Sequence, residues 1–290
     1  MVNNFQNRNV AKLAGIMFQL NRSFRIYSCL ILLILCSLLG LPLDASASER
    51  VALVIGNGAY QYGGRMLNPS NDAHDMAALL KRVGFDVIEG EDLGYSSMLA
   101  NMSAFATATT DSKVAFFYYS GHGMQVGGEN YLIPVDAKLE DRTAIEYETI
   151  NVTNIFRYMV DLNRTSIAFI DADRDNPLAS DIASTLGVSG STGAGAGLAA
   201  PRISGGGLLI GFSTSAGMVA YDGEGRNSPY TSALLRELPT PGVEIQQLMT
   251  RVKADVFDMT KGEQEPSDYS SLRQEFFMIP GVLSNEVTCH

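Results

Sequence analysis

One histidine and two aspartates are the residues of this chain whose types and positions are best suited to chemistry. His122 stands between two glycines in the stretch YYSGHG, and Asp171 and Asp173 close the apolar run SIAFIDAD. An imidazole can transfer a proton near neutral pH, and carboxylates can bind a cation or a basic side chain. The flanking glycines allow a tight turn, which predicts an imidazole exposed at the rim of the fold. The alternative is a histidine that only packs or caps, and His74, on a polar helix, is expected at the surface.

Short β-rich runs that alternate with helical runs must position these side chains. Such alternation predicts an α/β domain with a mostly parallel sheet and helices on both faces. The expected strands are 51–56, 85–90, 113–123, 165–173, 207–214 and 274–279, and the expected helices are 71–84, 95–109, 152–163, 229–237 and 243–259. The pair Gly127-Gly128 predicts a hairpin. Because ligands bind beyond the carboxyl ends of parallel strands, we expect His122 and the two aspartates in one cleft.

The charge balance limits the partners that this chain can attract. The composition, 46% hydrophobic and 18% charged, is that of an ordinary globular protein, and the formal net charge is −10. Residues 1–47 hold four basic residues and one acidic residue, which leaves 17 basic and 30 acidic residues, a net charge of −13. Nucleic acid and anionic lipid are therefore not expected as main partners, whereas a basic peptide or a cation would be attracted.

The N-terminus has the pattern of a secretory signal. An apolar run, IYSCLILLILCSLLGLPL, follows two arginines and precedes Ala45-Ser46-Ala47, which has the small-x-small form of a cleavage site. We therefore predict a signal peptide over 1–47, with Met17 as a possible true start, and a periplasmic or secreted mature protein. An uncleaved membrane anchor formed by residues 26–43 is the alternative.

The cysteine count excludes several kinds of site. Cys29 and Cys36 lie in the predicted leader, so the mature chain retains only Cys289, close to its end. There is no disulfide framework and no cysteine-based metal site to propose. We predict neither a cofactor nor a resident metal.

Several motifs, in order, carry a resemblance to a known family. The stretch FYYSGHGMQVGGENYLIPVD is followed by IAFIDADRDNPL, then by STSAGMVAYDGEGRNSPYTSALL and MTKGEQEPSDYSSL. From Arg50 to Ile279 the chain resembles the caspase-like cysteine peptidases (peptidase C14), specifically the bacterial metacaspase or orthocaspase type. The resemblance implies a caspase-like three-layer sandwich, in which a mostly parallel sheet of six strands carries helices on both faces.

The resemblance also implies how the mature chain is organised. The caspase-like domain would cover 48–282, with a larger p20-like part at 50–180 and a smaller p10-like part at 207–280. Between these parts, residues 181–206 are mostly Gly, Ala, Ser or Thr, which predicts a flexible linker. Residues 283–290 would form a tail.

The position of the family's nucleophile holds an unexpected residue. In the family, the histidine after the third strand, matched by His122, pairs with a cysteine in the pattern Asp-x-Cys-Arg. The matching stretch reads Asp171-Ala172-Asp173-Arg174, so Asp173 occupies the cysteine position. A carboxylate that attacked a peptide carbonyl would form a mixed anhydride and be expelled again. The resemblance therefore predicts a pseudopeptidase that acts by binding or regulation.

Two alternatives to the pseudopeptidase stay open at this point. One is an active endopeptidase with arginine or lysine specificity and a displaced nucleophile. The other is a non-catalytic scaffold or a cation-binding domain, in which carboxylates and His122 would hold the ion. If Asp173 lies within a few ångströms of His122, the two should form an ion pair that raises the pKa of the histidine.

The substrate pocket that the resemblance implies is better preserved than the nucleophile. Asp72, Ser120 and Asp171 match the acidic pocket in which metacaspases hold arginine or lysine, so basic peptide or protein segments are the expected partners. Pro69 departs from the pattern, because many relatives have a cysteine there. Asp72 also has a simpler explanation, since an acid at the start of a helix is favoured by the helix dipole.

Overall fold

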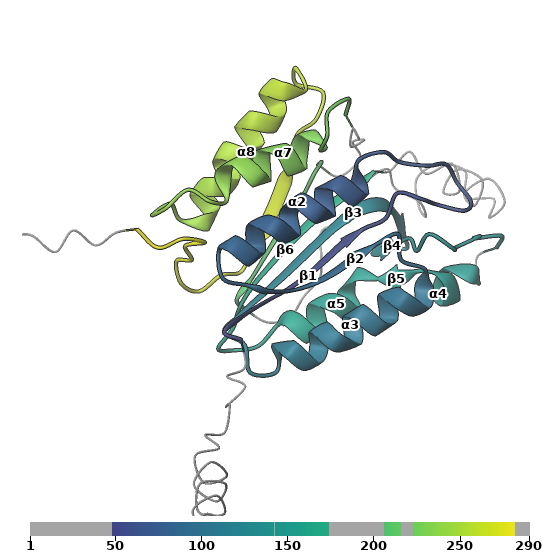
Figure 1. The fold of residues 1–290 in the computed structure, drawn as a ribbon, viewed down its shortest axis with the longest axis horizontal. Coiled ribbons are helices and arrows are strands. Elements are labelled where there is room, and N and C mark those ends of the chain that lie inside the picture. Colours follow the sequence, from purple (N-terminus) through teal and green to yellow (C-terminus); the bar gives the residue numbers. More distant parts are fainter. Residues whose placement is uncertain (1–47, 142, 174–205, 216–222, 282–290) are drawn as a thin grey trace, which may run out of the picture. The chain divides into compact units, whose positions relative to one another are not determined.

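The computed structural model describes residues 48–141, 143–173, 206–215 and 223–281 (Figure 1). All of them belong to one compact unit, Ala47–His290. The predicted leader, nearly all of the predicted linker and the predicted tail lie outside these ranges. Within the described part, no helix is long and apolar enough to span a membrane.

A six-stranded sheet forms the centre of the domain. Its strands are β2 (Asp86–Glu91), β1 (Arg50–Gly56), β3 (Val114–Val126), β6 (Thr165–Asp173), β7 (Leu208–Phe212) and β8 (Ser267–Ser270), in that spatial order. The first five are parallel to one another, and β8 runs antiparallel to β7. Two short strands, β4 (Glu129–Leu132) and β5 (Ile150–Asn151), form a small antiparallel ribbon with the C-terminal part of β3.

Helices cover both faces of this sheet, which gives three layers (Figure 1). One face carries α2 (Pro69–Arg82), α7 (Pro229–Glu237) and α8 (Ile245–Met259). The other carries α3 (Tyr95–Thr109) and α5 (Val152–Met159), and the short α4 (Ala144–Glu148) lies near the β4–β5 ribbon. Five of the six expected strands and all five expected helices are present within a few residues of their predicted positions.

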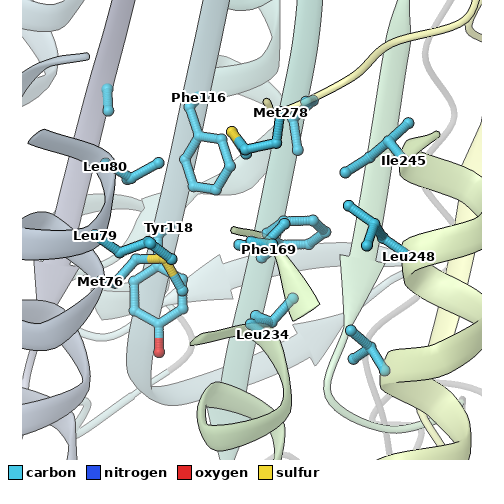
Figure 2. Close-up of a cluster of buried hydrophobic side chains, with 14 of the residues drawn as sticks. Met76, Leu79, Leu80, Phe116, Tyr118, Phe169, Leu234, Ile245, Leu248 and Met278 are labelled. Atoms are coloured by element: carbon cyan, nitrogen blue, oxygen red, sulfur yellow. The ribbon is translucent and has the colours of Figure 1, made fainter. Parts of the chain in front are cut away.

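The aromatic run in β3 shows why a central strand of such a sheet is apolar on both sides. Phe116 and Tyr118 pack into the core beneath α2, α7 and α8, as Figure 2 shows. Phe117 and Tyr119 point the other way and join the core beneath α3 and α5. Successive side chains alternate between the two faces of a strand, so a strand covered on both faces needs an uninterrupted hydrophobic run.

The prediction of a last strand at 274–279 is wrong. Phe277 makes only an isolated bridge to Glu244, while Phe276 and Met278 are buried in the core beside α8. The sixth strand is the more polar β8, which the sheet accepts as an edge because backbone pairing with β7 holds it.

The prediction of a hairpin at Gly127-Gly128 is confirmed. These residues join β3 to the antiparallel β4 with φ angles of 61° and 86°. Positive φ at both central residues is what a tight two-residue hairpin turn requires.

Candidate functional site

The strand register brings most of the predicted site residues together near the carboxyl ends of the central strands β3 and β6. Across the parallel β3–β6 pair, Ser120 is the partner of Asp171, and His122 is the partner of Asp173. Asp72 reaches the same place from the first turn of α2, where its Oδ2 accepts a hydrogen bond of 2.9 Å from Ser120 Oγ. Asp72 thus has the helix-start position that favours an acid, and it also contacts Ser120 of the predicted pocket.

Asp72 and Asp171 form a buried carboxylate pair. Asp72 is fully buried and Asp171 is 5% exposed. Asp72 Oδ1 accepts a hydrogen bond of 3.1 Å from the backbone N–H of Ser228, whose hydroxyl donates to Asp171. Thr231 Oγ1 also donates to Asp171 Oδ2, at 3.1 Å. Ser228 therefore touches both carboxylates and connects them.

The environment of this pair makes negative charge costly. Burial, and next the nearby charge of Asp171, raise the pKa of Asp72 to about 8, although the hydrogen bonds from Ser120 and Ser228 act in the opposite direction. Two carboxylates that share a buried site resist ionising together. The pair is consequently disposed to hold a proton or to accept a cation.

Ser228 is one of the site residues that reasoning from the sequence missed. It caps α7, because its hydroxyl oxygen accepts a hydrogen bond of 2.9 Å from the backbone N–H of Thr231. A serine directly before Pro229 is a recognisable start of a helix. Ser228 is 156 positions from Asp72 and 57 positions from Asp171 in the sequence, so no local sequence pattern could predict these contacts.

The expectation that the imidazole of His122 is exposed at the rim is wrong. His122 is only 4% exposed, and the ring of Tyr60 packs against its imidazole with the ring centroids 4.4 Å apart and the planes inclined by 38°. Tyr60 comes from the loop that follows β1, and its hydroxyl accepts a hydrogen bond of 2.6 Å from the backbone N–H of His122. A tight turn at glycine exposes a side chain only if no other segment covers it.

A second tyrosine fixes the backbone around His122. Tyr119 Oη donates to the carbonyl of His122 at 2.8 Å and lies 3.2 Å from Tyr60 Oη. Gly121 sits within this arrangement at a φ of 150°, where a Cβ atom would come within 2.7 to 2.8 Å of both tyrosine hydroxyls and of the Asn57 carbonyl oxygen. The glycine is required here by close packing as well as by its backbone angle.

For the predicted ion pair between His122 and Asp173, the structure describes the backbone pairing alone. The two backbones are partners across the β3–β6 ladder, but the side chain of Asp173 is not among the described parts of the structure. The ion pair stays a prediction.

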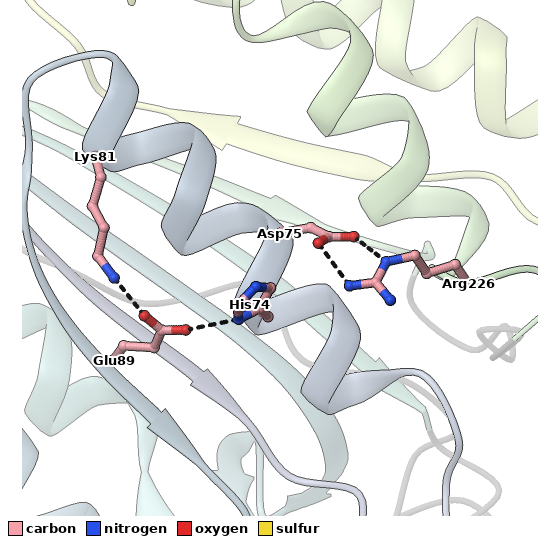
Figure 3. Close-up of polar contacts among 5 residues, drawn as sticks. All are labelled: His74, Asp75, Lys81, Glu89 and Arg226. Atoms are coloured by element: carbon pink, nitrogen blue, oxygen red, sulfur yellow. Dashed lines mark hydrogen bonds and ion pairs between the residues drawn. The ribbon is translucent and has the colours of Figure 1, made fainter.

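A different cluster has the composition of a possible cation site. Among the described side chains, the group of three potential ligands close enough to share an ion is His74, Glu89 and Glu91, with ligand atoms within 4.8 Å of one another. His74 is exposed, as expected, and the cluster lies between α2 and the edge strand β2, where Lys81 already pairs with Glu89 at 2.7 Å (Figure 3). Asp72, Asp171 and His122 do not form such a group.

Comparison with known proteins defines first the class of fold and then the family. The chain superposes on caspase-1 from Spodoptera frugiperda with a TM-score of 0.56, covering 82% of this chain and 92% of that chain at 17% sequence identity. That similarity shows the caspase-like α/β fold, which confirms the predicted fold class. The family profile of the caspase domain, peptidase C14, matches residues 49–277. The chain therefore belongs to the caspase-domain family.

Two curated relatives match a smaller region. They are the mucosa-associated lymphoid tissue lymphoma translocation protein 1 of Homo sapiens and its homolog in Mus musculus, each 31% identical over 91 residues. The match covers 31% of this chain and 11% of the length of each relative.

Proposed function

We propose that this chain is a caspase-fold pseudopeptidase, which binds an arginine or lysine side chain at the Asp72–Asp171 pair without cutting the peptide. The observation that carries this proposal is the burial of two neighbouring carboxylates, one with a pKa raised to about 8. A guanidinium or ammonium group would relieve the repulsion within the pair, and the planar guanidinium fork suits two carboxylates especially well.

The hydroxyl groups around the pair support a binding role. Ser120, Ser228 and Thr231 donate hydrogen bonds to the two carboxylates and fix their orientation. Each carboxylate oxygen can accept more than one hydrogen bond, so these contacts are compatible with additional bonds from a ligand. A site whose carboxylates are already oriented loses less entropy when the ligand binds.

The absence of catalysis follows, in this proposal, from Asp173. It stands opposite His122 in the ladder, where the family places its cysteine, and a carboxylate there cannot form a productive acyl intermediate. Loss of the nucleophile of a covalent enzyme lowers the rate by several powers of ten. Binding or regulation of a basic segment is then the remaining function.

The proposal is tested by calorimetry with acetyl-arginine amide and its neutral counterpart acetyl-citrulline amide. We expect the arginine compound to bind and the citrulline compound to bind far more weakly. Asp171→Asn should weaken the arginine compound by about 10- to 100-fold, the usual effect of losing a charged hydrogen bond. Asp86→Asn, at an exposed position of β2, should change nothing. Equal binding of the two compounds, or full binding by Asp171→Asn, would contradict the proposal.

We also propose that the protein is exported. The apolar N-terminal run and the small-residue motif that follows it support this proposal. N-terminal sequencing of the protein from its source should find Ser48 as the first residue. A protein recovered with residues 26–43 intact in the membrane fraction would favour the anchor instead.

A further inference from the structure

A short segment, residues 223–228, leads into α7 and lies against α2 and the carboxylate pair; we call it the strap. Near its start, the carbonyl of Gly223 accepts a hydrogen bond of 3.4 Å from Asn68 Nδ2 at the beginning of α2. At its end, Ser228 contacts both Asp72 and Asp171. The strap therefore determines where Ser228 stands relative to the pair.

A bidentate ion pair joins the middle of the strap to α2. Arg226 Nε donates to Asp75 Oδ2 at 2.8 Å, and the terminal Nη2 donates to Asp75 Oδ1 at 2.9 Å, as Figure 3 shows. These bonds lower the pKa of the Asp75 carboxyl and raise that of the Arg226 guanidinium. Such a fork has a fixed geometry, so it defines orientation as well as distance.

The Arg226–Asp75 ion pair and the buried Ser228–Asp72 hydrogen bond both join the strap to α2. Asp72 and Asp75 are three residues apart on α2 and so lie on one side of the helix, and Arg226 and Ser228 are two residues apart on the strap. The outer contact joins Arg226 to Asp75, and the inner contact joins Ser228 to Asp72. A shift of the outer contact along α2 would move Ser228 away from the carboxylates.

We infer that Asp75 and Arg226 are positioning residues, which set the affinity of the Asp72–Asp171 pair for a basic side chain by holding Ser228 in place. This inference rests on the proposed function. Neither residue needs to touch the ligand. Because the ion pair is partly exposed to solvent, its main effect is on geometry and its effect on stability is small.

Single substitutions distinguish positioning from a simple effect of charge. If the pair acts only through its charge, Asp75→Asn removes a negative charge near the site and weakens binding of a cation. Arg226→Gln removes a positive charge and strengthens it. If the pair positions Ser228, both substitutions weaken binding, because both release the strap.

The experiment measures binding of acetyl-arginine amide to the full chain by calorimetry. We expect Asp75→Asn and Arg226→Gln each to weaken binding about three- to fivefold, and Arg226→Lys, which keeps the charge but loses the fork, to weaken it as well. The exchanged pair Asp75→Arg with Arg226→Asp should recover most of the loss. Thermal melts identify any variant that has failed to fold.

Amide hydrogen exchange at Ser228 supplies a readout that needs no ligand. Its N–H donates to Asp72, so we expect faster exchange in both single variants and slow exchange in the exchanged pair. The inference would be overturned if Asp75→Asn and Arg226→Gln changed the affinity in opposite directions or if both bound more tightly. Unchanged exchange at the Ser228 amide would overturn it as well. If the wild-type protein does not bind acetyl-arginine amide, the proposed function fails, and the exchange rates alone decide whether the ion pair positions Ser228.

Discussion

His122 and Asp173 are direct partners across the parallel β3–β6 ladder, and two residues earlier the same ladder pairs Ser120 with Asp171. A step of two residues along a strand is about 7 Å. A basic side chain held at Asp171 would therefore place the adjoining peptide bond close to His122. In the proposed function, the ladder therefore sets the pocket for a basic side chain next to the histidine, and the residue opposite that histidine is an aspartate.

The carboxyl of Asp72 should make stability depend on pH. Its pKa is about 8 in the folded protein and about 4 in an unfolded chain. Between these values the folded state holds the proton more tightly, so the free energy of unfolding decreases as the pH rises, by up to about 1.4 kcal/mol per pH unit. Above a pH of about 8 this contribution is lost.

Urea titrations over this pH range compare the wild type with Asp72→Asn. We expect the variant to lose the decline between pH 4 and 8, whereas Asp86→Asn, at an exposed position, keeps it. An identical decline in the wild type and Asp72→Asn would show that Asp72 is not the group responsible.

Binding of a basic ligand should also depend on pH, in the opposite sense. The cation requires an ionised carboxylate, but Asp72 is mostly protonated below its pKa of about 8. Affinity for acetyl-arginine amide should rise as the pH increases toward 8, and binding should release a proton. Calorimetry in buffers of different ionisation enthalpy measures that proton. Affinity that is constant between pH 6 and 8, with no proton released, would contradict this account.

Removing the ring of Tyr60 should expose His122. In the wild type, diethyl pyrocarbonate should modify the exposed His74 much faster than His122, which lies beneath Tyr60. In Tyr60→Ala, the rate at His122 should approach that of His74. Tyr60→Phe keeps the ring and loses only the hydroxyl that accepts the His122 N–H, so its effect should be smaller. Peptide mass spectrometry separates the two sites, and rapid modification of His122 in the wild type would show that Tyr60 does not cover it.

Gly121 should tolerate no side chain. Gly121→Ala would force a Cβ atom against two tyrosine hydroxyls and a carbonyl oxygen, and should lower the free energy of unfolding by about 2 to 4 kcal/mol. Gly127→Ala is the matched control, because its φ is also positive but its Cβ would meet no atom within 4 Å. It should cost only about 1 kcal/mol. Equal losses in urea titrations would mean that backbone conformation, and not the close packing, sets the cost at Gly121.

Most of the fold could be predicted because its central strands are apolar, whereas its last strand could not be predicted. Continuous hydrophobic runs such as that of β3 are typical of a sheet covered on both faces. The run at 274–279 contains four consecutive apolar residues but packs as irregular chain, and the polar β8 forms the edge instead. Local pattern does not decide between them, because pairing with β7 and burial beside α8 are tertiary effects.

The candidate site was predictable where residues follow strand ends or match a family motif. Asp72, Ser120 and Asp171 do so, and the structure brings them together. The cover provided by Tyr60 and the contacts of Ser228 could not be predicted, because each joins segments far apart in the sequence. These contacts change the expected chemistry most, since one packs against the histidine ring and the others orient the carboxylates.

Turnover by an Asp173→Cys variant tests the central claim most directly. The assay uses a fluorogenic substrate with arginine before the scissile bond, and it compares the wild type with Asp173→Cys and with Asp173→Cys combined with His122→Ala. We expect no turnover by the wild type, measurable turnover by Asp173→Cys, and its loss when His122 is also replaced. Turnover by the wild-type protein that disappears in His122→Ala would contradict the account, because it would show a working peptidase with another nucleophile.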